Sequence, residues 1–315
     1  MLWYAARRIA ASVPVLLLVT LISFSMMHLV PGDPAAAIAG SGATNAEVEA
    51  IRLQLGLDKP FLVQLATWFG GLLQGDLGRS ILLNRPVWQA IVERLPITLP
   101  LALFALALTL LIGVPAGVIA ALRANTWIDQ AVTGLAMLGV SVPSFWLALM
   151  LIVLFGVHLE WLPTGGFVPF GEDPVGWARS MVLPSISLAL LQIGLLARIT
   201  RGTMLEVLRQ DYVRTARAKG LPGWMVIGKH ALKNVMVPVV TVIGISFGLL
   251  LSGSIVIETV YGMPGIGRLI ANAIFGRDYP VIQGGLLLTG TILVLLNLVV
   301  DLLYAVIDPR VRYGS

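Results

Sequence analysis

The sequence predicts an all-α integral membrane protein with six membrane-spanning helices, and three observations support this prediction. The 315 residues are 57% hydrophobic and only 12% charged, with a mean hydropathy of +0.91, whereas soluble domains carry about 25% charged residues. Six stretches reach the length of about 20 apolar residues that a helix needs to cross a bilayer. They lie at about 9–30, 97–122, 131–157, 181–199, 235–257 and 281–307. The third observation is the distribution of positive charge.

Positive charge predicts the orientation of these spans. With both termini in the cytoplasm, 13 of the 21 Lys and Arg residues lie on the inner side. Five of the eight outer ones fall in the segment 31–96, which is too long to count for orientation. Without that segment, 13 Lys and Arg residues lie on the inner side and three on the outer side, which predicts an N-in, C-in topology. The run after Arg7 and Arg8 lacks a small-residue cleavage site and is interpreted as an uncleaved helix rather than a signal peptide.

Composition also excludes several kinds of site. The chain has no cysteine, which rules out disulfides, thiolate metal ligands and cysteine nucleophiles. The three histidines, His28, His158 and His230, share no metal-ligand spacing, so no metal site is predicted. The net charge of +5 is explained by membrane orientation, so no nucleic-acid partner is expected.

The outer segment 31–96 predicts a small external subdomain. Thr44 and Glu47 form a capping box before a helix of about 45–55, which Gly56 ends. Pro86 suits the first turn of a further short helix with Val87, Ile91 and Leu95 on one face. The stretch Gly75-Asp-Leu-Gly78 between them predicts a turn. The simplest interpretation of this subdomain is a lid that packs on the outer helix ends.

The longest inner loop, about 200–234, predicts a helix, a break and a second helix. Gly220 and Pro222 end the first, basic helix, and a second short helix carries Trp224, Ile227 and Leu232 on one side. Residues 223–230 approach the G-x-x-x-x-G-K-[ST] phosphate loop, but they follow no strand and His230 replaces the hydroxyl residue. Nucleotide binding is therefore not predicted here. A basic loop attracted to anionic lipid is the alternative.

At this loop the sequence resembles the inner-membrane permease subunits of bacterial ABC importers. Their loop has the form E-A-A-x-x-x-G followed by I-x-L-P; here Ala216, Gly220 and Leu232 match, while Arg214, Thr215, His230 and Lys233 depart from it. The departures resemble the first (B-type) permease of the dipeptide, oligopeptide, nickel and glutathione subfamily. Its further motifs are D-Y-V-R-T-A-R-A-K-G (211–220), H-A-L-x-N (230–234), Pro238, P-G-D-P (31–34), G-D-L-G (75–78), G-M-P-G-I-G (262–267), R-D-Y-P-V-I (277–282) and I-D-P-R (307–310).

This resemblance implies the type I permease fold of ABC importers, as a single transmembrane domain over residues 1–315 with an external insertion between the first two helices. The 211–234 loop would couple the chain to a separate ATP-hydrolysing subunit. The expected coupling residues are Arg214, Thr215, Ala216, Arg217, Lys219, Gly220, Leu221 and Trp224. The chain itself would be neither an enzyme nor a cofactor protein, because ATP and Mg belong to the partner subunits. The expected partners are a homologous second permease, two ATP-binding subunits, a substrate-binding protein and the lipid of the bacterial inner membrane.

Polar residues inside the spans raise further expectations, because such side chains usually face a pore or a partner. The fourth and fifth spans flank the coupling loop, and Ser187, Gln192, Thr241, Ser246 and Ser252 are expected to line a substrate path. The alternative is that they serve only helix packing and interhelical hydrogen bonds.

Asn297, Asp301, Tyr304 and Asp308 share one face of the sixth span, and Asp301 is expected to pair with Arg198 or Arg201. Glu258 is expected to end the fifth span, with an outer helix beginning after Pro264.

These expectations define the predicted function as import of dipeptides or oligopeptides driven by ATP. A nickel or glutathione importer of the same family is an alternative that these motifs do not separate. A self-contained secondary transporter is a third class, but it predicts an inverted repeat or clear buried ion ligands, and the sequence shows neither.

Overall fold

The computed structural model describes residues 2–29, 33–40, 42–54 and 56–307. Its helices in chain order are α1 (Leu2–Leu29), α2 (Pro34–Ala39), α3 (Asn45–Gln54), α4 (Phe61–Leu73), α5 (Val87–Val92), α6 (Leu95–Leu122), α7 (Trp127–Ser141), α8 (Ser144–Leu151), α9 (Pro174–Leu208), α10 (Asp211–Ala218), α11 (Gly223–Met225), α12 (Leu232–Val260), α13 (Ile266–Phe275) and α14 (Tyr279–Ile307). Two π-helical turns, Ile152–His158 and Val226–Ala231, extend α8 and α11. Within the described ranges, the β pairing is an isolated bridge between Arg79 and Pro86.

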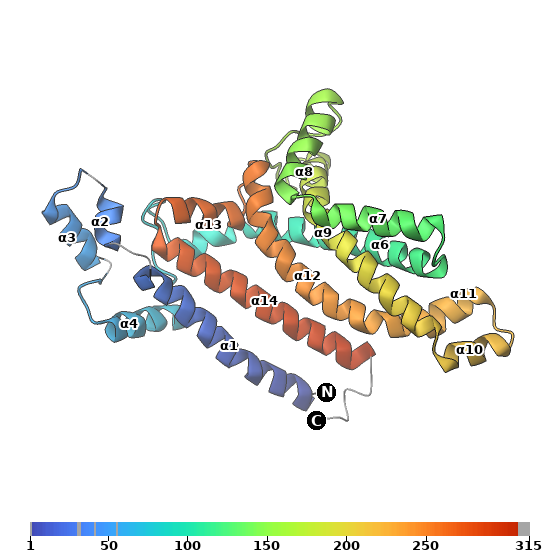
Figure 1. Ribbon diagram of the computed structural model, residues 1–315. Coiled ribbons are helices and arrows are strands. Elements are labelled where there is room, and N and C mark those ends of the chain that lie inside the picture. Colours follow the sequence, from blue (N-terminus) through green and yellow to red (C-terminus); the bar gives the residue numbers. More distant parts are fainter. Residues whose placement is uncertain (1, 30–32, 41, 55, 308–315) are drawn as a thin grey trace.

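Five of the six predicted spans are confirmed as helices long and apolar enough to cross a membrane: α1, α5–α6, α9, α12 and α14. The third, predicted as one helix over 131–157, is wrong in shape. It consists of α7 and α8, which meet at 101°, and α8 projects away from α7 in Figure 1. Pro143, which has no N–H to continue the helix, stands between the two. Counted as one broken span, the pair brings the total to six.

The fourth span was also predicted to be shorter than the helix that the structure shows. Instead of 181–199, α9 covers 35 residues, Pro174–Leu208, and is the longest helix in the described part of the chain. Pro184 lies inside it and does not end it, as is common in membrane helices, where neighbouring groups satisfy the freed carbonyl. Residues 200–208 are consequently helix rather than loop, and they carry the helix beyond the apolar stretch.

Small residues bring α6, α7 and α9 close together. A Cβ atom on Gly117 of α6 would lie 2.5 Å from the carbonyl oxygen of Ala197 in α9. On the other side of α9, a Cβ atom on Gly194 would overlap the carbonyl oxygen of Ala136 in α7. Close backbone approach at glycine is typical of helix packing in membranes.

The two ends of the bundle have different elements (Figure 1). The beginning of α1 and the end of α14 lie at the same end as α10 and α11, whereas α2, α3, α4 and α13 lie at the opposite end. Along the bundle, α1 packs on α14, and the hydroxyl of Ser23 donates a hydrogen bond to the carbonyl of Gln283 at 2.9 Å. This arrangement agrees with the prediction that both termini share a side with the coupling loop.

The external segment follows its predicted turns and adds two helices. The carboxylate of Glu47 accepts a hydrogen bond from the N–H of Thr44 at 2.7 Å, which confirms the capping box and lowers the pKa of Glu47. Gly56, with φ +66°, follows the helix as predicted. Gly75 and Gly78 adopt positive φ in the predicted turn, where Asp76 accepts a hydrogen bond from the N–H of Gly78.

The helix after Pro86 is confirmed as α5, with Val87 and Ile91 fully buried. The prediction missed α2 and α4. Asp33 caps α2 by accepting from the N–H of Ala35 at 3.0 Å, which explains the Asp-Pro pair of the P-G-D-P motif; Pro31 and Gly32 lie outside the described residues.

Candidate functional site

The inner unit between α9 and α12 folds around its own small core. Val213 and Ala216 on one face of α10 are buried against Val226 of the following π-helical turn. Val207, Leu208 and Leu221 close this core from the inner end of α9 and from the turn. The unit is therefore a packed extension of the two spans that flank it, not a free loop.

The break between the two helices lies at the predicted glycine. Gly220 has φ +75°, a region that side chains with a Cβ rarely adopt, and its N–H donates to the carbonyl of Arg217 at 2.9 Å. Pro222 then precedes α11 as its N-cap residue. The second helix differs from the prediction because α11 continues through the π-helical turn into α12 without a further break.

The three residues expected on one side of this second helix differ in burial. Ile227 and Leu232 are half-buried, but Trp224 is 73% exposed. Because residues 223–231 form helical turns, their backbone geometry differs from a phosphate-binding loop, in which free N–H groups converge.

The eight predicted coupling residues divide into an exposed surface and a buried support. Ala216 is buried and Leu221 half-buried, so both belong to the core of the unit. The other six are exposed: Arg214, Thr215, Arg217, Lys219, Gly220 and Trp224. They present three positive charges and one large aromatic ring around the turn at Gly220. We call these six residues the coupling surface.

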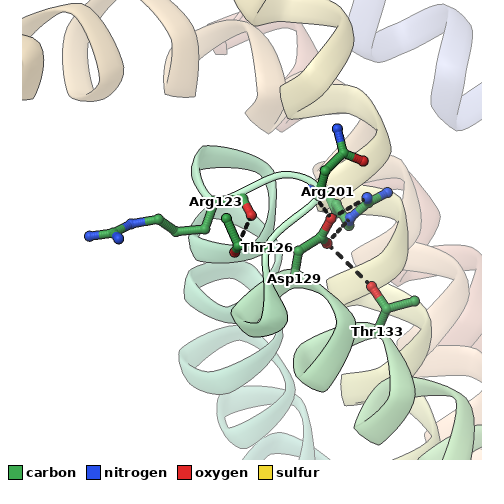
Figure 2. Close-up of polar contacts among 6 residues, drawn as sticks. Arg123, Thr126, Asp129, Thr133 and Arg201 are labelled. Carbon is green, nitrogen blue, oxygen red and sulfur yellow. Dashed lines mark hydrogen bonds and ion pairs between the residues drawn. The ribbon is translucent and has the colours of Figure 1, made fainter.

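One polar contact holds the unit to α12, and a second joins the inner part of α9 to α7. The side chain of Asn234 in the first turn of α12 donates to the hydroxyl of Tyr212 in α10 at 2.7 Å. Further along α9, Arg201 makes a two-pronged ion pair with Asp129 at the start of α7, with N···O distances of 2.5 and 2.7 Å. Figure 2 shows the Asp129 carboxylate between Arg201 and Thr133. The Asp129 side chain is only 5% exposed, whereas the Arg201 side chain is 29% exposed and keeps contact with the solvent.

Arg201 pairs with Asp129, and Arg198 is exposed. The expected pairing of Asp301 with Arg198 or Arg201 stays a prediction. The side chains of Asp301 and Tyr304 and the whole of Asp308 lie outside the described residues, as do residues 308–310 of the I-D-P-R motif. Asn297 is exposed on α14.

The five predicted pathway residues do not lie on one surface. Ser187, Gln192 and Ser246 are buried inside the protein. The hydroxyl of Ser246 donates to Gln192 at 3.1 Å, which joins α12 to α9, while Ser187 donates to the carbonyl of Leu183. These contacts match interhelical and local hydrogen bonding. Thr241 and Ser252 are exposed on α12, on a face that also carries Ile245, Leu249 and Val256.

At the outer surface, the helix expected after Pro264 is confirmed as α13, and Glu258 is in the last turn of α12. Sequence reasoning missed the roles of Tyr212, Asn234 and Asp129. Tyr212 and Asn234 belong to the neighbouring motifs D-Y-V-R-T-A-R-A-K-G and H-A-L-x-N, and this proximity in the sequence could have indicated a contact between them. Asp129 is a lone acid at the start of an apolar run, and nothing in the sequence indicates its partner 72 residues away.

Comparisons with known proteins agree with this architecture. Residues 113–313 match the family described as "Binding-protein-dependent transport system inner membrane component", and residues 1–102 match its N-terminal counterpart. A putative peptide transport system permease protein of Brucella abortus is 53% identical over 307 residues, covering 98% of both chains. The dipeptide transport system permease proteins DppB of Alkalihalophilus pseudofirmus and Escherichia coli K12 are 44% and 41% identical, covering 99% of this chain and 100% and 99% of theirs.

The fold is also similar to a solved structure, the inward-facing MetNI methionine ABC transporter. The TM-score is 0.58 at 18% identity, with 70% of this chain and 97% of the other covered. The uncovered part is consistent with an additional segment in this chain. With its membrane helices, its packed inner unit and two family matches that together cover nearly its whole length, the chain belongs to the family of inner-membrane components of binding-protein-dependent transport systems.

Proposed function

We propose that this chain is the permease subunit of an ATP-driven importer for dipeptides or oligopeptides. The observation that supports this most directly is the coupling surface, a packed and basic projection held between two spans at the end of the bundle where α1 begins and α14 ends. The relatives named as peptide or dipeptide permeases align over nearly the full length, which supports the peptide class of substrate.

The coupling surface would seat in a groove of an ATP-binding subunit. A packed unit suits this role because closure of the partner has to move membrane helices, and a flexible loop would absorb the displacement. Arg214, Arg217 and Lys219 favour an acidic groove and would mainly speed the association. Trp224 supplies the large exposed aromatic group that often dominates the binding energy of an interface.

The exposed face of α12 would face the pathway between this chain and a homologous second permease. It combines two hydroxyl side chains, Thr241 and Ser252, with apolar residues and no charge. Such a face suits passage of peptides of varied side chains, because it offers hydrogen bonds without selecting a charge. Two ATP-binding subunits and a substrate-binding protein complete the proposed assembly.

Reconstitution tests this function. The four membrane and ATP-binding subunits in proteoliposomes, together with the binding protein, are expected to accumulate labelled dipeptides or pentapeptides only when ATP is present. A partner ATPase without its catalytic base is the control. Uptake of nickel or glutathione but not peptides would assign the alternative substrate, and uptake without any ATPase subunit would overturn the proposal in favour of a secondary transporter.

Nucleotide dependence of the isolated chain gives a second check. Because the helical residues 223–231 do not form a phosphate loop, ATP is expected to leave its thermal unfolding temperature unchanged. A saturable rise with ATP concentration would place nucleotide binding in this chain and contradict the proposal.

A further inference from the structure

Glu258 is a buried carboxylate in the last turn of α12 that accepts hydrogen bonds from two other helices. The residue is 0% exposed. Its Oε1 accepts a hydrogen bond from the hydroxyl of Thr98 in the first turn of α6 at 2.6 Å, and its Oε2 accepts from the backbone N–H of Arg268 in α13 at 2.9 Å. The Thr98 oxygen in turn accepts from the N–H of Ile266 at 2.8 Å. Three helices therefore meet at one carboxylate.

The first turn of α13 explains how this carboxylate is stabilised. The first N–H groups of a helix have no partner within the helix, and they carry partial positive charge that favours an anion. Within the described residues, no Lys or Arg side chain forms an ion pair with Glu258, and the side chain of Arg268 donates instead to the carbonyl of Gly262. A buried carboxylate without donors is very costly, so Glu258 depends on Thr98 and on the N-terminus of α13.

The glycines of the G-M-P-G-I-G motif make room for this contact. A Cβ atom on Gly265 would overlap the carboxyl carbon and both oxygens of Glu258. A Cβ atom on Gly267 would lie 2.6 Å from the Cα of Ile255 in α12. Gly265 has φ −87°, which any residue adopts. Glycine is therefore needed at this position to leave space for the carboxylate and not to allow a special backbone conformation.

The same helix, α12, begins at the inner unit and ends at this contact. Its first turn is bonded to Tyr212 of α10, and its last turn holds α13 through Glu258. On its other side α13 packs into an apolar cluster with α5 and α14, formed by residues that include Ile91, Ile270 and Ile282. A movement of α12 at the inner surface can thus be transmitted to α13 at the outer surface through the hydrogen bonds at the two ends of α12.

We propose that Glu258 and Thr98 form a clamp that makes α13 move as one body with the outer ends of α6 and α12. Glu258 is then a positioning residue that delivers movement of the coupling surface to the outer opening of the pathway. This inference rests on the proposed function for its transport readout. It goes beyond that function by assigning the outer mechanical contact to named residues.

Substitutions at Thr98 separate the hydroxyl from the shape of the side chain. Thr98→Ser keeps the donor to Glu258 and is expected to transport like the parent chain. Thr98→Val removes the donor and the acceptor for Ile266 and is expected to lower uptake per ATP hydrolysed about five-fold or more, with ATPase activity retained. Equal transport by the two variants, or a fall in ATPase and uptake in proportion to the amount of complex, would overturn the clamp.

A double-mutant cycle tests the contact between Gly265 and Glu258. Gly265→Ala is expected to reduce coupled uptake strongly, because its methyl group displaces the carboxylate. In chains that already carry Glu258→Ala, the same methyl group meets no carboxylate and is expected to cause no further loss. Additive losses would show that Gly265 acts independently of Glu258 and would contradict the proposal.

A distance measurement tests the rigid body without using any substrate. The chain has no cysteine, so Leu103→Cys on α6 and Phe275→Cys on α13 give two exposed labelling sites without background from this subunit. In the assembled complex, spin labels there are expected to show one narrow distance that is unchanged by ATP, and a broader distribution when Thr98→Val is added. A distance that shifts with nucleotide in the parent chain would refute the clamp, whereas failed peptide uptake with an intact distance would count only against the proposed substrate.

Discussion

The side-chain nitrogen of Asn234 donates a hydrogen bond to the hydroxyl of Tyr212 at 2.7 Å, and this contact ties α10 to the first turn of α12. The same nitrogen also donates to the carbonyl of His230, one turn earlier. Tyr212 and Asn234 are both exposed, yet their bond joins the two helical parts of the inner unit across the break at Gly220. A force on α10 therefore reaches α12 through a side-chain contact as well as through the turn.

Tyr212→Phe is expected to weaken this transmission while leaving the fold intact. The ring remains, and the lost hydrogen bond contributes about 1 kcal/mol. We therefore expect uptake per ATP hydrolysed to fall about two- to five-fold in the reconstituted complex, with an unchanged yield of folded protein. Asn234→Ala removes the same bond, so the double variant should be no worse than either single one. Losses that add would show that the two residues act separately.

Gly220→Val is expected to uncouple ATP hydrolysis from transport. A β-branched residue at φ +75° costs roughly 1–3 kcal/mol and shifts the turn between α10 and α11. The matched control is Gly223→Val, because Gly223 does not have a positive φ and has open space around a Cβ atom. Gly220→Asn should recover part of the activity, since Asn tolerates this region. Normal substrate-stimulated ATPase and uptake in Gly220→Val would contradict a mechanical role for the turn.

The ion pair of Asp129 and Arg201 predicts a stability effect that can be measured in detergent. Removing one partner of a buried pair costs about 3–5 kcal/mol, but the Arg201 side chain is 29% exposed and keeps part of its hydration. We expect Asp129→Ala to lower the free energy of unfolding by about 2 kcal/mol. Arg201→Ala in the same background should add little. An Asp129→Ala chain as stable as the parent would show that the pair contributes nothing.

Gly117→Ala tests the close approach of α6 and α9. The new methyl group would lie 2.5 Å from the Ala197 carbonyl oxygen, so the helices must separate, at a cost of about 1–3 kcal/mol. Gly134→Ala in α7 is the matched control, because a Cβ atom there meets nothing within 4 Å. We expect a lower unfolding temperature for Gly117→Ala only. Equal unfolding temperatures for the two variants would mean that α6 and α9 tolerate a wider separation.

Local signals in the sequence predicted much of this fold. The capping box of Thr44 and Glu47, the positive φ of Gly220 and the helix after Pro264 each follow from the chemistry of a few neighbouring residues. Apolar length predicted where the chain enters the bilayer. It did not predict the direction of the helix after Pro143, because hydropathy measures solvent preference and contains no information about angle.

Other features could not be predicted because they depend on distant partners. The helix α4 has 13 apolar-rich residues, which is too short for a membrane span, and no side chain caps its N-terminus. The sequence therefore did not predict it as a helix. The partner of Arg201 depends on the packing of α7 on α9, which brings Asp129 beside it from 72 residues away. Gln192 and Ser246 were predicted as pathway residues because they are polar, although each satisfies the other.

The proline inside α12 gives this helix unequal arms. Pro238 lies 15 residues after Gly223, where the continuous helical stretch begins, and 22 residues before Val260, and a proline removes one hydrogen bond from the helical ladder, so bending concentrates near it. A pivot there moves the outer tip about 1.5 times as far as the inner tip, since each residue adds about 1.5 Å to an arm. A displacement at the inner face thus becomes a larger displacement at the outer rim.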